Sequence, residues 1–511
     1  MPPRLRPCCG RRLALVLAFV LALGATALIG AAPARAADLT AGSEAELNAA
    51  IAAANAAGAG THTITLTADV TLTNPTTALD NPAATQLILD GDGHTIDGHG
   101  HGPILRVVAG TTARIHDVTL TGGQANAGAA ILNGGMLTVE NSTLSGNSAA
   151  ASGGGIHSAG DVTILSSRLD GNTANSGGAV ALTTAAITAT LIIRNTTIAN
   201  NTAQVTGGGV AVLSRQGGAA EFTANNIIVQ GNHAPGGTGG LDLSAGPGSS
   251  LEGNLNASQL LGNDGARGGL AVIAQGAAEF TVAGSTVAGN VATGPGGSSE
   301  SSAGVYARSD TGGTALLTLF NTTLSGNTTN RAGGGVLVVA NGGAAGANVV
   351  YSTLAGNTAA AGGGGVHTMA ANGGVASVRL SAAIITNGSG AGPDCARPSG
   401  AIISIGFNLA GDGTCFLNQG SDWPASPALL LPLAQAAPGK PATHALRFGS
   451  PAIDRIPRGG LGCGTAITTD QRSAPRPQSA GGRCDTGAFE RQAGETPEWQ
   501  AFLPAVWNSG Q

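Results

Sequence analysis

The chain has few charged and few aromatic side chains. Of its 511 residues, 10% are charged and 3% are aromatic, and Lys440 is its one lysine. After residue 36 the chain carries 18 basic and 28 acidic side chains, with no basic cluster among them. Nucleic acids and anionic membrane surfaces bind concentrated positive charge, so the sequence predicts neither as a partner.

Cysteine is absent from the long middle of the chain and returns only near its C-terminal end, at Cys395, Cys415, Cys463 and Cys484. No C-x-x-C spacing occurs and the nearest histidines are distant in sequence, which disfavours a zinc site. Four cysteines allow three pairings. We predict the sequence-near pairs, Cys395 with Cys415 and Cys463 with Cys484, each closing a loop of about 20 residues and contributing roughly 3 kcal/mol.

One long apolar run occurs, from Leu13 to about Gly30. It follows four arginines and precedes Ala34-Arg35-Ala36. A basic head, an apolar middle and an A-x-A site predict a secretory signal peptide over residues 1–36, cut before Ala37. An uncleaved anchor is the alternative, because the apolar run is long enough to span a bilayer. No later segment has that length, so we predict an exported protein of the extracellular space or cell envelope.

A short motif, Asn141-Ser-Thr-Leu-Ser-Gly-Asn147, recurs along the chain about every 30 residues. Such a period is typical of solenoids. An aliphatic residue stands three positions before the asparagine that ends each motif, and glycine clusters such as Gly153 to Gly155 follow most copies. The recurring asparagines are Asn147, Asn172, Asn201, Asn232, Asn263, Asn290, Asn327 and Asn357.

Apolar residues alternate with polar ones around each motif, as in Leu137-Thr-Val139. This period of two indicates β-strands, and units this short must stack to bury an interior. We predict a parallel β-helix of about ten coils, on the order of 50 Å long, and crossover chirality makes it right-handed. A flexible glycine-rich linker is the alternative, but the aliphatic residues in phase with every asparagine argue against it.

The recurring asparagine and glycine suggest a local role for each. We expect the asparagine to adopt the left-handed conformation of a sharp turn and its amide to bond its equivalents in a ladder through the stack. We expect the glycine clusters to supply positive φ angles and to let coils approach closely.

The segments flanking the repeats differ from them. Residues 37–60 contain a capping box, Ser43 to Glu46, that predicts an amphipathic helix covering the first coil. Repeats are predicted over 61–386, a disulfide-bonded C-terminal module over 387–490, and a linker with a short apolar tail over 491–511. The insertion from Gly294 to Ser302 is predicted to form a loop, either a mobile turn or part of a binding face.

Two resemblances accompany these patterns. The elements Gly177-Gly178-Ala179-Val180 and Leu144-Ser-Gly-Asn147 resemble the polymorphic outer membrane protein repeat, with an aliphatic residue where that repeat has Phe. Several ordered motifs, among them Gly449-Ser450-Pro451-Ala452-Ile453-Asp454 and Cys484-Asp485-Thr486-Gly487-Ala488-Phe489-Glu490, resemble the choice-of-anchor Q module of bacterial surface proteins. The resemblances imply an exported, surface-associated right-handed β-helix.

Catalysis on such a rod would need paired carboxylates from adjacent coils. The acidic residues of the repeats fall at different phases, and Glu140 has mainly Leu, Arg, Asn or Ala at its equivalents, so we expect no carboxylate stack. The positions judged to differ in phase are Asp161, Asp170, Asp242, Asp264 and Asp310.

Two polar clusters remain as candidates. The first could bind a metal or supply an acid and a base, although an Asp/Gly-rich turn is the simpler interpretation; it contains Asp90, Asp92, His94, Asp97, His99 and His101. The second could line a cleft in the C-terminal module, although ion pairs and turn hydrogen bonds are the simpler interpretation; it contains Asp454, Asp470, Arg472, Asp485 and Glu490.

The sequence therefore assigns no catalytic residue, no cofactor and no metal ligand. We predict a non-catalytic adhesin, spacer or carbohydrate-binding surface, with an extracellular polysaccharide or cell-surface glycan as its partner. A polysaccharide lyase or glycoside hydrolase on the same scaffold is the alternative. The oligomeric state is left open.

Overall fold

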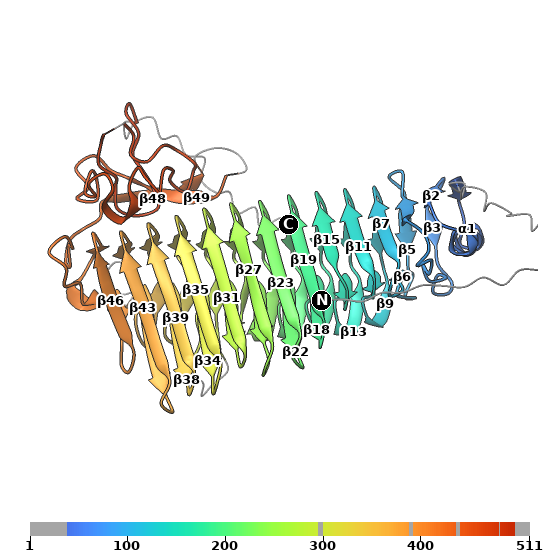
Figure 1. Cartoon of the computed structure of the whole chain (residues 1–511), viewed down its shortest axis with the longest axis horizontal. Helices are drawn as coiled ribbons and strands as arrows, with labels where there is room; N and C mark the ends of the chain where they lie inside the picture. The colour runs from blue at the N-terminus through green and yellow to red at the C-terminus, as the bar shows by residue number, and fades with distance from the viewer. Residues whose placement is uncertain (1–37, 295–299, 388–391, 436–439, 480, 496–511) are drawn as a thin grey trace, which may run out of the picture.

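The computed structural model describes residues 38–294, 300–387, 392–435, 440–479 and 481–495. The predicted signal peptide and most of the predicted C-terminal tail lie outside these residues. The described chain is a right-handed parallel β-helix, as the repeats predict, with a C-terminal segment folded against one side of the rod (Figure 1).

Each complete coil crosses four parallel sheets in turn, two more than the alternations in the sequence show. The longest sheet has 14 strands, so the prediction of about ten coils is too low, and the rod is about 60 Å long. We number the sheets in the order in which the chain visits them.

The first sheet has the longest strands. It consists of β1 (Asp38–Ala41), β2 (Thr61–Leu66), β4 (Gln86–Asp90), β7 (Thr112–His116), β11 (Met136–Glu140), β15 (Val162–Leu165), β19 (Thr188–Arg194), β23 (Ala219–Asn225), β27 (Ser250–Asn256), β31 (Ala277–Ala283), β35 (Thr314–Phe320), β39 (Ala344–Val350), β43 (Val375–Ser381) and β46 (Ala401–Gly406).

The second sheet follows after a sharp turn. It consists of β3 (Val70–Thr71), β5 (Thr95–Asp97), β8 (Thr119–Thr121), β12 (Thr143–Ser145), β16 (Arg168–Asp170), β20 (Thr197–Ala199), β24 (Ile228–Gln230), β28 (Gln259–Leu261), β32 (Thr286–Ala288), β36 (Thr323–Ser325), β40 (Thr353–Ala355), β44 (Ile384–Thr386) and β47 (Leu409–Ala410).

The third sheet is absent from the first coils. It consists of β9 (Gln124–Ala127), β13 (Ser148–Ser152), β17 (Thr173–Ser176), β21 (Thr202–Thr206), β25 (His233–Thr238), β29 (Asp264–Arg267), β33 (Val291–Ala292), β37 (Thr328–Thr329) and β41 (Thr358–Ala359).

The fourth sheet completes the coil. It consists of β6 (Leu105–Val107), β10 (Ile131–Asn133), β14 (Ile156–Ser158), β18 (Val180–Ala185), β22 (Val210–Arg215), β26 (Leu241–Ala245), β30 (Leu270–Ala274), β34 (Val305–Asp310), β38 (Val336–Asn341), β42 (Val366–Ala371) and β45 (Cys395–Ala396).

The asparagine ladder that the repeats predict runs through the interior, and all eight of its asparagines are fully buried. In each step the side-chain amide nitrogen donates to the Oδ1 atom of the next asparagine at 2.8–3.0 Å, as from Asn147 to Asn172. It also donates to the carbonyl of the aliphatic residue in the coil before, as to Leu120. Asn387 extends the ladder to the carboxylate of Asp394, which accepts at 2.9 Å.

The left-handed position at this turn belongs to the residue before the ladder asparagine, which corrects the expectation from the sequence. Gly146 has a φ of 63°, and the equivalent position before Asn201 is Asn200 with a φ of 55°. Glycine reaches this region without a steric cost. The ladder asparagine is therefore free to point its side chain inward.

A helix covers the N-terminal end of the rod (Figure 1). It is α1 (Glu44–Ala56), whose N-terminal cap is Ser43, as the capping box predicts. Its buried face, with Leu47 and Ile51, joins the main core. One strand, β1, precedes the helix and pairs with β2, which the sequence does not indicate. None of the described residues forms a helix long and apolar enough to cross a membrane.

The last coil lies C-terminal to residue 386, in β45, β46 and β47. After it comes the C-terminal segment, residues 411–495, with two short 3-10 helices, Gly413–Cys415 and Gly460–Gly462, and one antiparallel pair, β48 (Leu430–Gln435) and β49 (Ala442–Leu446). Both predicted disulfides are confirmed. The predicted boundary between repeats and module stays a prediction.

The C-terminal segment docks on the second sheet through polar contacts. The side-chain nitrogen of Gln471 donates to the carbonyl of Ser285 at 3.1 Å, and its oxygen accepts from the hydroxyl of Thr323 at 2.5 Å. The backbone nitrogen of Ala488 donates to the hydroxyl of Thr353 at 3.0 Å. These contacts span several coils, and at the end of the rod the segment also reaches β46 of the first sheet, where the hydroxyl of Ser404 donates to Asp422 at 2.6 Å.

A buried arginine centres this interface. The guanidinium of Arg476 lies 4.5 Å from the ring centre of Tyr351 and donates to the carbonyls of Asp485 and Gly487 at 2.7 and 3.0 Å. The carboxylate of Glu490 is 3.5 Å from it. A buried cation over an aromatic face stabilises the contact between the segment and the rod.

Loss of one ladder amide should destabilise the rod. In Asn232→Ala, two accepted and two donated side-chain hydrogen bonds disappear from a buried position. Because buried polar groups are left unpaired, we expect the free energy of unfolding to fall by about 3 kcal/mol. Urea unfolding followed by circular dichroism measures this. The control Asn348→Ala removes a half-buried amide of the first sheet and should cost well under about 1 kcal/mol; equal losses in both variants would contradict a special role of the ladder.

The docked segment should lose stability as pH rises. Burial and the neighbouring Asp485 carboxylate raise the pKa of Glu490 above its ordinary 4.5, and they outweigh the charge of Arg476, which lowers it. The folded state then holds a proton that the unfolded state has released, so this contribution is fully present below about pH 4.5 and declines as pH rises through the raised pKa.

Glu490→Gln keeps an acceptor for the backbone nitrogen of Asp485 and removes the titration. We expect its unfolding free energy to fall less steeply than that of the unaltered protein between about pH 5 and about pH 8. Denaturant unfolding at several pH values, with Glu495→Gln as the control, measures the slopes. Parallel slopes for the Glu490→Gln variant and the unaltered protein would refute the account.

Candidate functional site

The outer face of the first sheet carries side chains in columns, because its strands pair in register from coil to coil. Alternation sends Phe280 into the core and Glu279 outward from the same strand. Neighbouring strands lie about 4.8 Å apart, so equivalent side chains stand one above another along the rod. One column consists of Thr190, Glu221, Glu252, Glu279, Leu316, Gly346 and Ser377.

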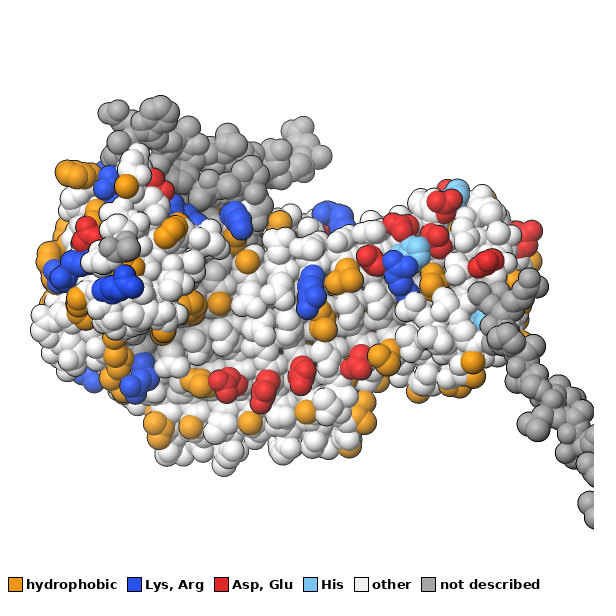
Figure 2. All heavy atoms as spheres, turned by 45° about the horizontal axis from the view of Figure 1, so that its top comes forward, with side chains coloured by type: hydrophobic (Ala, Val, Ile, Leu, Met, Phe, Trp, Pro, Cys, Tyr) orange, Lys and Arg blue, Asp and Glu red, His pale blue; other side chains and the backbone are white. Residues whose placement is uncertain are grey.

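Three adjacent members of this column form a glutamate row, Glu221, Glu252 and Glu279. All three side chains are exposed. Figure 2 shows acidic side chains in a row along the middle of the rod. None of the described residues forms a hydrogen bond or an ion pair with them. The row is therefore a band of negative charge that the described chain does not neutralise.

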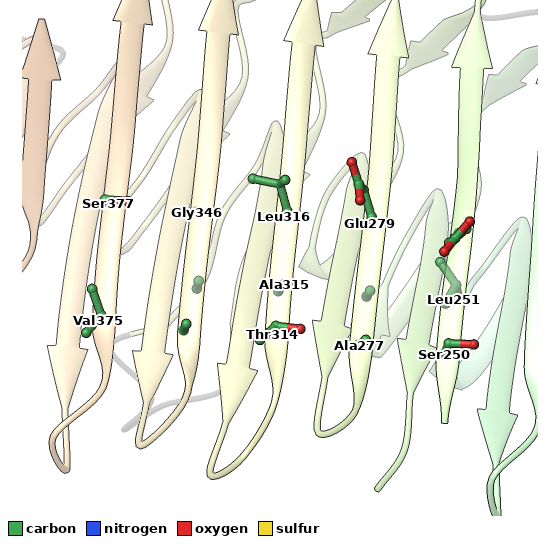
Figure 3. A pocket seen from close by; sticks show the side chains of 14 residues that line it. Ser250, Leu251, Ala277, Glu279, Thr314, Ala315, Leu316, Gly346, Val375 and Ser377 are labelled. Atoms are coloured by element: carbon green, nitrogen blue, oxygen red, sulfur yellow. The ribbon is translucent and has the colours of Figure 1, made fainter. Parts of the chain in front are cut away.

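A shallow trough extends along the rod from the glutamate row (Figure 3). One hollow of about 430 Å³ crosses β27, β31, β35, β39 and β43, where small side chains lower the sheet surface. A second hollow of about 310 Å³ lies over β23, β27 and β31. The two hollows share Glu252 and Glu279 and border the glutamate row on its two sides, and we call the two hollows together the trough. Its other outward positions include Ser250, Ala277, Thr314, Leu316, Ala344, Gly346, Val375, Ser377, Thr223, Asn254 and Thr281.

The glutamate row corrects the expectation that no carboxylate stack exists. Each of the three glutamates stands eleven residues before its ladder asparagine, as Glu252 does before Asn263. Asp161 also stands eleven residues before its ladder asparagine, one column position beyond Thr190. Its Oδ1 atom accepts a hydrogen bond from the backbone nitrogen of Thr190 at 2.8 Å. The third sheet and the turn from the fourth sheet to the first differ in length between coils, which makes the spacing between the glutamates uneven. The signal therefore appears only when positions are counted back from the ladder asparagine.

The first candidate cluster of the sequence does not converge on one point. Asp90 ends β4 and accepts from the backbone nitrogen of Asp92 at 3.0 Å. The carboxylate of Asp97 accepts from the backbone nitrogen of His99 at 2.8 Å in the next turn. The ring of His94 pairs with Asp69 at 3.2 Å. The Asp/Gly-rich turn therefore explains most of this motif.

A histidine that the sequence did not single out joins Asp90. His116 ends β7 and lies in register with Asp90 on one side and Glu140 on the other. Its Nδ1 atom is 3.6 Å from an oxygen of Asp90 and 2.6 Å from an oxygen of Asp117. Among the described residues, Asp90, His116 and Asp117 are the group whose potential metal-ligating atoms all lie within 4.8 Å of one another.

The two carboxylates of this group, Asp90 and Asp117, border an open hollow of about 410 Å³ at the turn between the first and second sheets. Asp92 and Asn141 also line it. The hollow lies several coils nearer the N-terminal end of the rod than the trough.

The second candidate cluster is an ion-pair network and not an open cleft. The guanidinium of Arg472 forms ion pairs with Asp470 at 2.9 Å and with Glu495 at 2.8 Å. The backbone nitrogen of Asp454 donates to Asp485 at 2.7 Å. With Asp470, Asp485 and Glu490 buried, these groups hold the C-terminal segment together.

Comparison with known proteins finds a weak similarity to a solved structure. No protein-family model matches the chain, and no curated protein matches it. Among solved structures, the chain is similar to the catalytic domain of a GH87 alpha-1,3-glucanase, solved as its D1069A variant in complex with tetrasaccharides. The sequence identity is 10% and the TM-score is 0.32. The alignment covers 74% of this chain and 70% of that one. A similarity at this level carries no argument about activity.

The glutamate row should cost stability at low salt. Like charges opposite one another on neighbouring strands repel, and Glu252 has such a neighbour on both sides. We therefore expect Glu252→Gln to raise the thermal midpoint at low ionic strength by about 1 °C or more, and added salt to remove the gain. Scanning calorimetry measures it. Asp80→Asn, which removes an exposed charge near the N-terminal end of the rod, should show no such gain; an equal gain there would contradict the repulsion.

Proposed function

We propose that this protein is an exported, non-catalytic β-helix rod that binds a linear polysaccharide along the trough of its first sheet. The observation that carries the proposal is the direction of the trough, which crosses successive strands and so follows the long axis of the rod. An extended polymer can lie along such a surface and contact outward side chains of each coil that it crosses.

The trough chemistry favours neutral or amino sugars. Its polar side chains are Ser, Thr, Asn and Glu, and none of the residues that line it is cationic. Carboxylates accept strong hydrogen bonds from hydroxyl and ammonium groups. The unneutralised glutamate row would repel the carboxylates of a uronate polymer, which gives selectivity through an unfavourable contact.

Glycoside hydrolysis is the second candidate, and the glutamate row is the observation that favours it. Retaining glycosidases place two carboxyl groups about 5 Å apart, which is close to the strand spacing between Glu252 and its neighbours. A general acid must also keep its proton near neutral pH, usually through burial. All three glutamates are exposed, so binding is the better supported function.

The proposed location outside the cytoplasm rests on the signal-peptide pattern of residues 1–36 and on the two disulfides, which persist in oxidising compartments. On a cell surface, a glycan-binding rod of this length would act as an adhesin or as a spacer.

The test measures binding and turnover on a panel of polysaccharides: a neutral glucan, chitosan and polygalacturonate. We expect saturable binding to the first or second polymer, little binding to polygalacturonate, and no new reducing ends. In Glu221→Gln/Glu252→Gln/Glu279→Gln, we expect binding to weaken at least tenfold, because the charged acceptors are lost.

Asp80→Asn serves as the control and should bind like the unaltered protein. New reducing ends that disappear in the triple variant would establish the hydrolase instead. An absence of binding to every polymer would leave the rod without this function.

A further inference from the structure

We propose that Asp90, His116 and Asp117 form a binding site for a divalent transition-metal ion at the N-terminal end of the first sheet. The site is separate from the trough and its glutamate row. It brings together one imidazole nitrogen and two carboxylate oxygens from two neighbouring coils.

The backbone fixes the three side chains. Asp90 and His116 are direct register partners on β4 and β7. Asp117 follows His116 at a turn with a φ of 52°, and its backbone nitrogen donates to the carbonyl of Glu140 at 3.1 Å. Ligands held on paired strands keep their spacing without an ion, which lowers the entropy cost of binding one.

The distances suit a small ion. His116 Nδ1 lies 2.6 Å from Asp117 and 3.6 Å from Asp90. Ligands of a tetrahedral zinc ion are each about 2.0–2.2 Å from the metal and lie roughly 3.4 Å from one another. The contact between His116 and Asp117 is shorter than this, and rotation of their side chains would widen it.

The local charge favours a cation. Asp90 and Asp117 face His116 across the site, and Asp92 lines the same hollow. The nearby cation Arg114 is engaged with Glu140 at 2.7 Å. The hollow of about 410 Å³ is open to solvent and leaves room for water ligands.

The donor set selects the metal class. Imidazole favours Zn²⁺, Fe²⁺ or similar ions, whereas carboxylates alone favour Ca²⁺ and Mg²⁺. One imidazole with two carboxylates and open positions therefore predicts tighter binding of Zn²⁺ or Co²⁺ than of Ca²⁺.

The chain offers a matched comparison in His233 and Asp264. Their contact has the same length, 2.6 Å, but no third metal-ligating side chain joins them among the described residues. Loss of His233 should leave metal binding unchanged if the three-residue group is the site.

The experiment is isothermal titration of the untagged, metal-free protein with Zn²⁺, with Co²⁺ absorption as a second readout. We expect one ion per chain, at least tenfold weaker binding in His116→Asn and in Asp90→Asn, and unchanged binding in His233→Asn. The Co²⁺ spectrum should disappear in the first two variants. Asp117→Asn should also weaken binding. Because Asp117 lies at a turn, this variant keeps the test valid if the two strand variants misfold. Circular dichroism of the metal-free variants, compared with that of the unaltered protein, checks their folding.

Equal Zn²⁺ affinity in the unaltered protein and in the folded His116→Asn, Asp90→Asn and Asp117→Asn variants would overturn the proposal. Ca²⁺ binding as tight as Zn²⁺ binding would also overturn it, because the imidazole would then contribute nothing. A loss of binding in His233→Asn equal to that in His116→Asn would do the same.

Discussion

The buried asparagine ladder is the interaction on which the rest of this structure depends. Each amide satisfies its neighbours in two coils and also a backbone carbonyl, so a coil that slipped by one residue would leave several buried polar groups unpaired. Such groups cost far more than a single hydrogen bond contributes. The ladder ends on Asp394, whose carboxylate accepts hydrogen bonds from the side chain and backbone of Asn387. Register is therefore fixed from inside the rod.

A fixed register determines what appears outside. Because strands of the first sheet pair in phase, residues at one position of successive coils become neighbours, and Glu221, Glu252 and Glu279 form a row although they are far apart in the chain. The same rule places His116 beside Asp90. The C-terminal segment covers part of the second sheet and leaves this outer face available for a ligand.

Much of the fold could be predicted from the sequence, because the repeat itself encodes it. The β-helix, the helix capped by Ser43 and both disulfides are confirmed. The glutamate row was missed because turns of unequal length hide its period, and β1 was missed because it is short and precedes the helix. The role of His116 depends on which coil lies next to Asp90, and that is a property of pairing and not of any local motif.

The central claim is that a glycan lies along the first sheet, and the crystal structure of the protein soaked with a neutral or amino-sugar oligosaccharide tests it most directly. The account predicts sugar rings in the trough, parallel to the rod, with hydroxyl or ammonium groups on Glu252 and Glu279. Sugar bound on the fourth sheet or on the C-terminal segment, with the trough free of sugar, would contradict it.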